Sequence, residues 1–141
     1  MVSTKIEKKE IIGIKKLINS ILGKSARGLF YSMGQIIGKN IAEECNNADR
    51  EKFFKNVGNI ISERNLAKSI SFDNNLITVT DSIEVIKNNR KSTDADKCHI
   101  LRGVIVAFYE TFYNRKMYCE EIECESLGSD RCVFKIEKEA F

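Results

Sequence analysis

The sequence lacks several features that would place a protein in a familiar functional class. No apolar stretch approaches the ~20 residues that a membrane-spanning helix needs. The first ten residues lack the apolar core of a secretory signal. No glycine-rich nucleotide-binding motif occurs, and no basic patch is interleaved with aromatic residues as in nucleic-acid-binding domains. We therefore expect a cytoplasmic protein with no membrane span and no nucleic-acid partner. Proline and tryptophan are also absent, but we infer no function from that.

Length and composition indicate a single globular domain. The 141 residues are 43% hydrophobic and 30% charged, with a net charge of +3, which is ordinary for a soluble protein. A chain of this size buries roughly 70% of its unfolded surface, which suffices for one core but not for two. We expect one domain over residues 1–141.

Residues 1–65 have the apolar periodicity of three helices, the first of which would turn its lysines toward solvent. The second helix is expected to run to about Cys45. Its stripe of small residues, Gly34, Gly38 and Ala42, favours close backbone packing over a space left for a ligand or a partner. The predicted caps of the three helices are, in order, Thr4 with Glu7 as a capping box, Ser25, and Asn46 or Asn47.

Residues 66–141 have the pattern of a hairpin, a helix and a second hairpin. Apolar and polar residues alternate on both sides of a turn at 73–75, and the second strand is predicted to end near Asp81. The order of helices, hairpin, helix and hairpin predicts an α+β fold with an antiparallel sheet. The later elements are expected at 98–112 for the helix, with Asp96 as its cap, and at about 117–125 and 131–137 for the two strands.

Cysteine is the most informative residue type in this chain. A reducing compartment argues against a disulfide framework, so clustered cysteines are first considered as metal ligands or redox groups. Four of the five lie between positions 98 and 132. If Gly128 is the centre of the last turn, Cys124 and Cys132 lie directly opposite each other, with Cβ atoms about 4.5–5.5 Å apart. Both sulfurs could then reach one metal ion.

Cys98 is a third candidate ligand, because the dipole of a helix beginning there would lower its thiol pKa and favour the thiolate. A fourth ligand is needed for a closed tetrahedral site, and zinc is the ion that best fits such a set. Glu121 and Cys124 would face opposite sides of a regular strand, so their joint use requires a bulge. Strand alternation does not choose among the four candidates Glu121, Glu123, Cys119 and His99.

The C-terminal half contains several short motifs in a distinctive order. They are, in sequence, Asp81-Ser82-Ile83-Glu84, Cys98-His99-Ile100-Leu101-Arg102-Gly103, Glu121-Ile122-Glu123-Cys124, Gly128 and Cys132-Val133-Phe134. Together they resemble the 4-vinyl reductase domain family, also called hydrocarbon-binding proteins. The resemblance is good over 76–137 and weaker over 26–75. It implies a zinc ion held by Cys98, Glu121, Cys124 and Cys132, and thereby selects Glu121 as the fourth ligand. Such a site leaves no open position, so we expect structural zinc.

The resemblance also implies a fold shared with haem nitric-oxide sensors and with subunits of the TRAPP vesicle-tethering complex. In that fold, helices pack on an antiparallel sheet around an apolar pocket, and family members commonly form homodimers. We therefore expect a binding or sensing module for an apolar, hydrocarbon-like small molecule rather than an enzyme. The alternatives are an enzyme or accessory in vinyl-group reduction of tetrapyrroles and a structural assembly subunit. The candidate ligand-binding residues are Phe30, Phe54, Phe72, Phe108 and Phe112.

Overall fold

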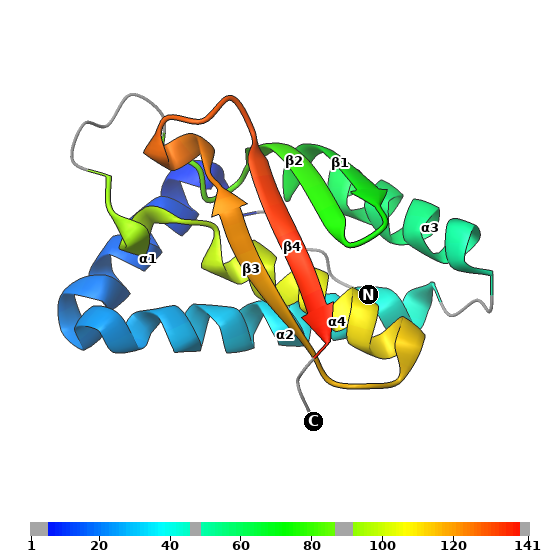
Figure 1. Ribbon diagram of the computed structural model, residues 1–141. Helices are drawn as coiled ribbons and strands as arrows, with labels where there is room; N and C mark the ends of the chain where they lie inside the picture. The colour runs from blue at the N-terminus through cyan, green and yellow to red at the C-terminus, as the bar shows by residue number, and fades with distance from the viewer. Residues whose placement is uncertain (1–5, 46–48, 87–91, 139–141) are drawn as a thin grey trace.

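The computed structural model describes residues 6–45, 49–86 and 92–138, which form helices and one four-stranded sheet (Figure 1). The predicted α+β fold, with its order of helices, hairpin, helix and hairpin, is confirmed. The helices are α1 (Lys8–Leu22), α2 (Ala26–Glu44), α3 (Arg50–Glu63) and α4 (His99–Tyr113). The strands are β1 (Ala67–Asp73), β2 (Leu76–Ser82), β3 (Met117–Glu123) and β4 (Cys132–Lys138). Three short 3₁₀ turns lie at Gly23–Ser25, Asp94–Asp96 and Glu125–Leu127.

The sheet is antiparallel throughout, with the strand order β1-β2-β4-β3. The two hairpins are therefore joined side by side through β2 and β4, where Ile77 pairs with Phe134. Alternate residues of these strands, such as Val79 and Ile136, are buried on one face, because the side chains of a strand point to opposite sides in turn. In Figure 1, β3 and β4 cross in front of α4, which packs on that buried face.

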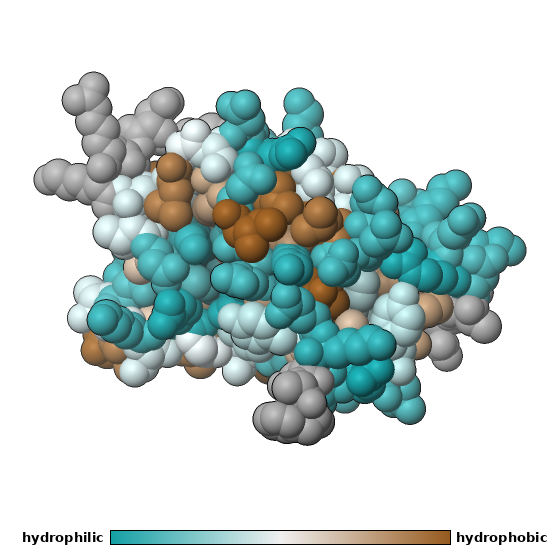
Figure 2. Space-filling view, in the orientation of Figure 1, coloured by the Kyte–Doolittle hydropathy of each residue, from teal (hydrophilic) through white to brown (hydrophobic). Residues whose placement is uncertain are grey.

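The opposite face of the sheet is open to solvent among the described residues. Figure 2 shows a small hydrophobic area there, surrounded by hydrophilic side chains. Leu76 on β2 and Ile122 on β3 are among the exposed large apolar residues. None of the helices in the described ranges is long and apolar enough to cross a membrane.

Helices α2 and α4 approach each other so closely that glycine is required at the crossing. A Cβ atom added to Gly34 would overlap the carbonyl oxygen of Ile100, and one added to Gly103 would overlap that of Tyr31. Gly38 likewise has no room beside the backbone of Val104. The expectation that the small residues of α2 serve close backbone packing is confirmed.

Several helix caps differ from the predicted ones. Glu7 is itself the first cap and forms a capping box with Glu10, whereas Thr4, Asn46 and Asn47 lie outside the described residues. The cap of α3 is Asp49, whose carboxylate accepts hydrogen bonds from two backbone N–H groups of the first turn. Several consecutive polar residues precede α3 and could each cap it, and the cap is a later one, Asp49, than the predicted Asn46 or Asn47.

The remaining two caps are governed by 3₁₀ turns. Ser25 stands at the cap of α2, but its side chain makes no capping bond, and its own backbone already has helical angles. The prediction that Asp96 caps α4 is wrong. Its carboxylate accepts a hydrogen bond from the backbone N–H of Thr93 at 2.9 Å, and Cys98 occupies the cap position of α4.

Substituting the crossing glycines tests this packing. We expect Gly103→Ala to lower the free energy of unfolding by about 1–3 kcal/mol or more, because the overlapping neighbour is backbone and cannot move aside alone. Gly28→Ala on α2 is the matched control. No atom lies within 4 Å of its added Cβ, so alanine should stabilise the helix by up to about 1 kcal/mol. Urea denaturation of both variants measures the difference, and equal effects would contradict the close crossing.

Candidate metal centre and the start of helix α4

Four buried side chains converge where α4 begins. Each of Cys98, Glu121, Cys124 and Cys132 offers one ligand atom, and these atoms all lie within 4.8 Å of one another. Cys98 caps α4, Glu121 belongs to β3, Cys124 follows β3, and Cys132 is the first residue of β4. The structure thus brings together the four side chains that the family resemblance selected, and such a cluster could hold a metal ion.

The last hairpin achieves this convergence through an irregularity in β3. The register of β3 and β4 shifts between Glu121 and Glu123, which is the bulge that joint use of Glu121 and Cys124 required. Beyond the shift Glu123 pairs with Val133, and the same antiparallel register puts Cys124 opposite Cys132, as predicted. The sulfurs of these two cysteines lie within 4.8 Å of each other.

The geometry of the donors fits a tetrahedral zinc ion. Zinc–sulfur bonds of about 2.3 Å at a tetrahedral angle place two sulfurs about 3.8 Å apart, and the Sγ atoms of Cys98 and Cys132 are 3.9 Å apart. Glu121 Oε1 accepts a hydrogen bond from the backbone N–H of Cys98 at 2.9 Å. Its Oε2 is buried and has no hydrogen-bond partner among the described residues, although the Cys132 thiol is near enough to lower the carboxyl pKa. An unpaired buried oxygen beside three thiols suits a metal ligand.

The other candidates for the fourth ligand lie outside this group. Glu123 is exposed, since the bulge turns it to solvent. Nε2 of His99 lies 2.8 Å from the backbone oxygen of Asp94, and the ring is not part of the cluster. Cys119 is fully buried in the apolar core, where burial raises its thiol pKa far above the ordinary value.

Without metal, the three cysteines share their protons unequally. Hydrogen bonds from Cys132 and Cys98 hold the pKa of Cys124 far below its ordinary value. The same hydrogen bonds to Cys124, together with burial, raise the thiol pKa of Cys98 and of Cys132. The expectation that the helix dipole lowers the pKa of Cys98 is therefore wrong for the metal-free protein. Burial, followed by the nearby Cys124, raises the pKa of Glu121 to about 8.

A second buried carboxylate completes the start of α4. Glu84 Oε2 accepts a hydrogen bond from the backbone N–H of Leu101 at 2.8 Å, and its Oε1 accepts one from that of Ile100 at 3.0 Å. Together with Glu121 on Cys98, these bonds satisfy backbone donors that a helix leaves without intrahelical partners. Two carboxyl side chains therefore stand at the positive end of the α4 dipole.

Lys15 of α1 neutralises Glu84. Its Nζ donates to Glu84 Oε1 and to the backbone oxygen of Lys97, each at 2.8 Å, and the two side chains are 7% and 0% exposed. The prediction that the lysines of this helix all face solvent is wrong at this position. Lys15 lies between Ile11 and Ile18 on the apolar side of the helix, and that placement was the available signal.

The candidate ligand-binding aromatics divide into two groups. Rings of Phe54, Phe72, Phe108 and Phe112 form one cluster between α3, α4 and β1, with neighbouring centroids 5.0–6.4 Å apart. Phe30 lies apart from them on α2, with the ammonium group of Lys15 5.3 Å from its ring centroid.

Comparison with known proteins agrees with this architecture. Residues 77–138 match the family model of the 4-vinyl reductase domain, a range that contains α4 and all four residues of the metal-ligand cluster. The predicted resemblance to the 4-vinyl reductase domain family is therefore confirmed over this range. No match was found among the curated proteins.

Solved structures share the fold at low sequence identity. The phenol-responsive sensory domain of the transcription activator PoxR, solved with phenol, has a TM-score of 0.77 and 15% identity, covering 99% of this chain and 78% of that one. A vinyl-4-reductase family protein from Methanocaldococcus jannaschii has a TM-score of 0.63 and 18% identity, covering 96% and 83%. Trafficking protein particle complex subunit 3 from Naegleria fowleri, covalently bound to palmitic acid, has a TM-score of 0.59 and 13% identity, covering 96% and 98%. At these identities the likeness is one of fold.

The buried ion pair can be tested by a double-mutant cycle. We expect Lys15→Met to lower the free energy of unfolding by about 3 kcal/mol or more, because it leaves the Glu84 carboxylate buried without its cation. Adding Glu84→Gln should restore part of that loss, with a coupling of about 1 kcal/mol or more. Lys16→Met, at the exposed neighbouring position, should change stability by less than about 0.5 kcal/mol. Additive effects of the two substitutions would contradict the pair.

Proposed function

We propose that residues 1–141 act as one small-molecule-binding module whose fold is closed by a structural zinc ion. Cys98, Glu121, Cys124 and Cys132 would be its ligands. The observation that carries this proposal is the convergence of three buried sulfurs and an unpaired carboxylate oxygen within 4.8 Å. Soft thiolates with one carboxylate suit zinc, which tolerates mixed sulfur and oxygen ligands.

The donor set supports a structural role rather than a catalytic one. Three thiolates and one carboxylate fill a tetrahedral coordination sphere, so no position is left for water or a substrate. The ion would join the start of α4 to both strands of the last hairpin at its turn end, and its binding energy would contribute directly to folding. Function would then depend on what the remaining surface and core can bind.

The aromatic cluster supports an apolar ligand. Phe54, Phe72, Phe108 and Phe112 provide rings in contact with one another. Phe54 and Phe72 also line an open groove of about 410 Å³ between α3 and β1, whose other lining residues are mostly polar. The PoxR domain of the same fold is described as responsive to phenol, which supports a sensing role here.

Exposed apolar residues on the first two helices support association with another chain. Leu17 and Ile21 on α1 are 60% and 70% exposed, and Ile36 on α2 is 73% exposed. Large apolar side chains that are left exposed favour a protein interface where they form a contiguous patch. We propose that a second copy covers them in a homodimer. The same surface would also serve an assembly subunit bound to a different protein.

Native mass spectrometry tests the proposal directly, using protein purified without added metal and compared with its denatured mass. We expect a dimer with one zinc ion per chain and additional mass from a retained apolar molecule. A tetrapyrrole adduct would favour the enzyme or accessory function. A metal-free chain without an adduct would contradict both the zinc site and the binding function.

Substitution of one ligand should remove metal and stability together. Cys124→Ser is expected to lose the zinc ion and to lower the melting temperature by about 10 °C or more, since the ligands left behind are buried without their cation. Cys119→Ser is the matched control, because it makes the same change in the same hairpin outside the cluster. It should keep one zinc ion per chain. Retained metal in Cys124→Ser would contradict the ligand assignment.

Zinc affinity should depend on pH in a direction that follows from the protons on the metal-free site. Below about pH 8, Glu121 is mostly protonated, as are the Cys98 and Cys132 thiols. Zinc must displace these protons, so its apparent affinity should fall as pH decreases from 8 to 6. Competition with a chromophoric chelator measures this slope. Glu121→Gln should make it shallower by about one proton, and an unchanged slope would contradict the role of Glu121.

A further inference from the structure

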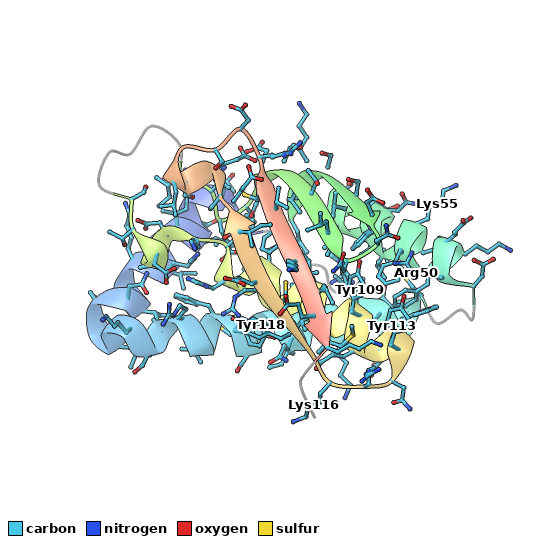
Figure 3. All side chains as sticks on the ribbon, viewed as in Figure 1. Arg50, Lys55, Tyr109, Tyr113, Lys116 and Tyr118 are labelled. Atoms are coloured by element: carbon cyan, nitrogen blue, oxygen red, sulfur yellow. The ribbon has the colours of Figure 1, made fainter. Side chains whose placement is uncertain are left out.

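A cleft of about 850 Å³ lies at the end of the sheet where the β1–β2 turn meets α3 and the C-terminal part of α4. Figure 3 shows Arg50, Tyr109 and Tyr113 close together at this end of the molecule. The volume is in the range of small-molecule sites. Among the residues that line the cleft are Arg50, Tyr109, Tyr113, Arg115, Lys135 and Lys138.

The lining of the cleft is strongly basic. It contains four basic residues and a single acid, Glu137, which already pairs with Lys135 at 3.1 Å. These few residues carry a formal charge of +3, as much as the net charge of the whole chain. Arg115 and Lys138 form no ion pair within the described ranges. Such a concentration of positive charge favours an anionic occupant.

Arg50 is held in a fixed position at the edge of this cleft. Its Nε donates a hydrogen bond to Tyr113 Oη at 2.7 Å, and its Nη2 donates to the backbone oxygen of Asn74 at 3.2 Å. Its guanidinium also lies over the ring of Phe54, 4.9 Å from the centroid. Nη1 makes no bond to any described residue. A preorganised guanidinium with unused donors is suited to a carboxylate or a phosphate.

Two tyrosines give the cleft an aromatic side. The rings of Tyr109 and Tyr113 are stacked, with centroids 6.2 Å apart and planes inclined by 22°. Tyr109 is buried, whereas Tyr113 is 41% exposed and can accept another ring against it. Met117 and Ile136 add apolar surface. A ligand without a ring would leave this side unused, and a neutral ring would leave the cations unused.

We propose that this cleft binds a small aromatic anion, meaning an aromatic ring that carries a carboxylate or a phosphate group. The ring packs on Tyr113, and the acidic group lies among Arg50, Arg115 and Lys135. This inference rests on the proposed small-molecule-binding function and names the ligand class and its place. It separates this chain from a module that binds only neutral hydrocarbons.

Isothermal titration of the full chain with four probes tests the proposal. Benzoate and phenyl phosphate represent the two sources of negative charge, phenol is the neutral ring, and inorganic phosphate is the anion without a ring. We expect at least one of the two aromatic anions to bind at least about tenfold more tightly than phenol and inorganic phosphate. The binding should weaken as salt is added.

Two variants and one control locate the binding in the cleft. Arg115→Ala and Tyr113→Ala should each lower the affinity for the aromatic anion by about tenfold. Lys116→Ala removes the same charge as Arg115→Ala at the adjacent residue, which does not line the cleft, so it should leave the affinity unchanged. Tyr113→Phe keeps the ring and provides a variant that retains the aromatic packing if Tyr113→Ala fails to fold.

The outcomes distinguish this inference from the proposed function. If phenol binds as tightly as benzoate and phenyl phosphate, or if Lys116→Ala weakens binding as much as Arg115→Ala, the cleft is not an aromatic-anion site. The proposed small-molecule-binding function would still hold in that case, with a neutral compound as the ligand. If no ring compound binds and the purified protein retains no molecule, both the inference and the proposed function are wrong.

Discussion

Helix α4 begins inside the protein, where its first backbone N–H groups have no water to bind. Glu121 accepts from the N–H of Cys98, and Glu84 accepts from those of Ile100 and Leu101. When ionised, each of these buried carboxylates needs a cation in turn, because an unpaired buried charge is costly. Lys15 supplies one to Glu84, and in our proposal zinc supplies the other to Glu121. The first helix and the last hairpin are thereby attached to the same helix end.

The two proposed sites, one for a metal ion and one for a ligand, lie at opposite ends of one helix. The N-terminal end of α4 carries the metal-ligand cluster, which a single ion would fill. Its C-terminal half carries Phe108, Tyr109, Phe112 and Tyr113, which contribute to the aromatic cluster and to the basic cleft. If a structural ion fixed one end of α4, as we propose, a ligand at the other end would meet a helix that is already positioned, and less of its binding energy would go into ordering the chain.

Local periodicity was enough to predict the helices, both hairpins and the α+β fold, since each of these follows from spacing within a short segment. The candidate site was less accessible to such reasoning. A bulge between Glu121 and Glu123 decides which side chains face the cluster, and strand alternation does not reveal it. Only the family resemblance selected Glu121. The pairing of Lys15 with Glu84 spans 69 positions, so no local pattern could identify the partner, although a lysine within an apolar stripe was a visible anomaly.

The central claim is that three cysteines and Glu121 hold one zinc ion at the start of α4. X-ray absorption at the zinc K-edge, on protein purified without added metal, tests it most directly. The proposed site predicts about three sulfur neighbours at about 2.3 Å and one oxygen neighbour at about 2.0–2.2 Å. A shell of four sulfurs would require Cys119 or Cys45 in place of Glu121, and a nitrogen neighbour would require His99. Either result, or a protein without zinc, would contradict the claim.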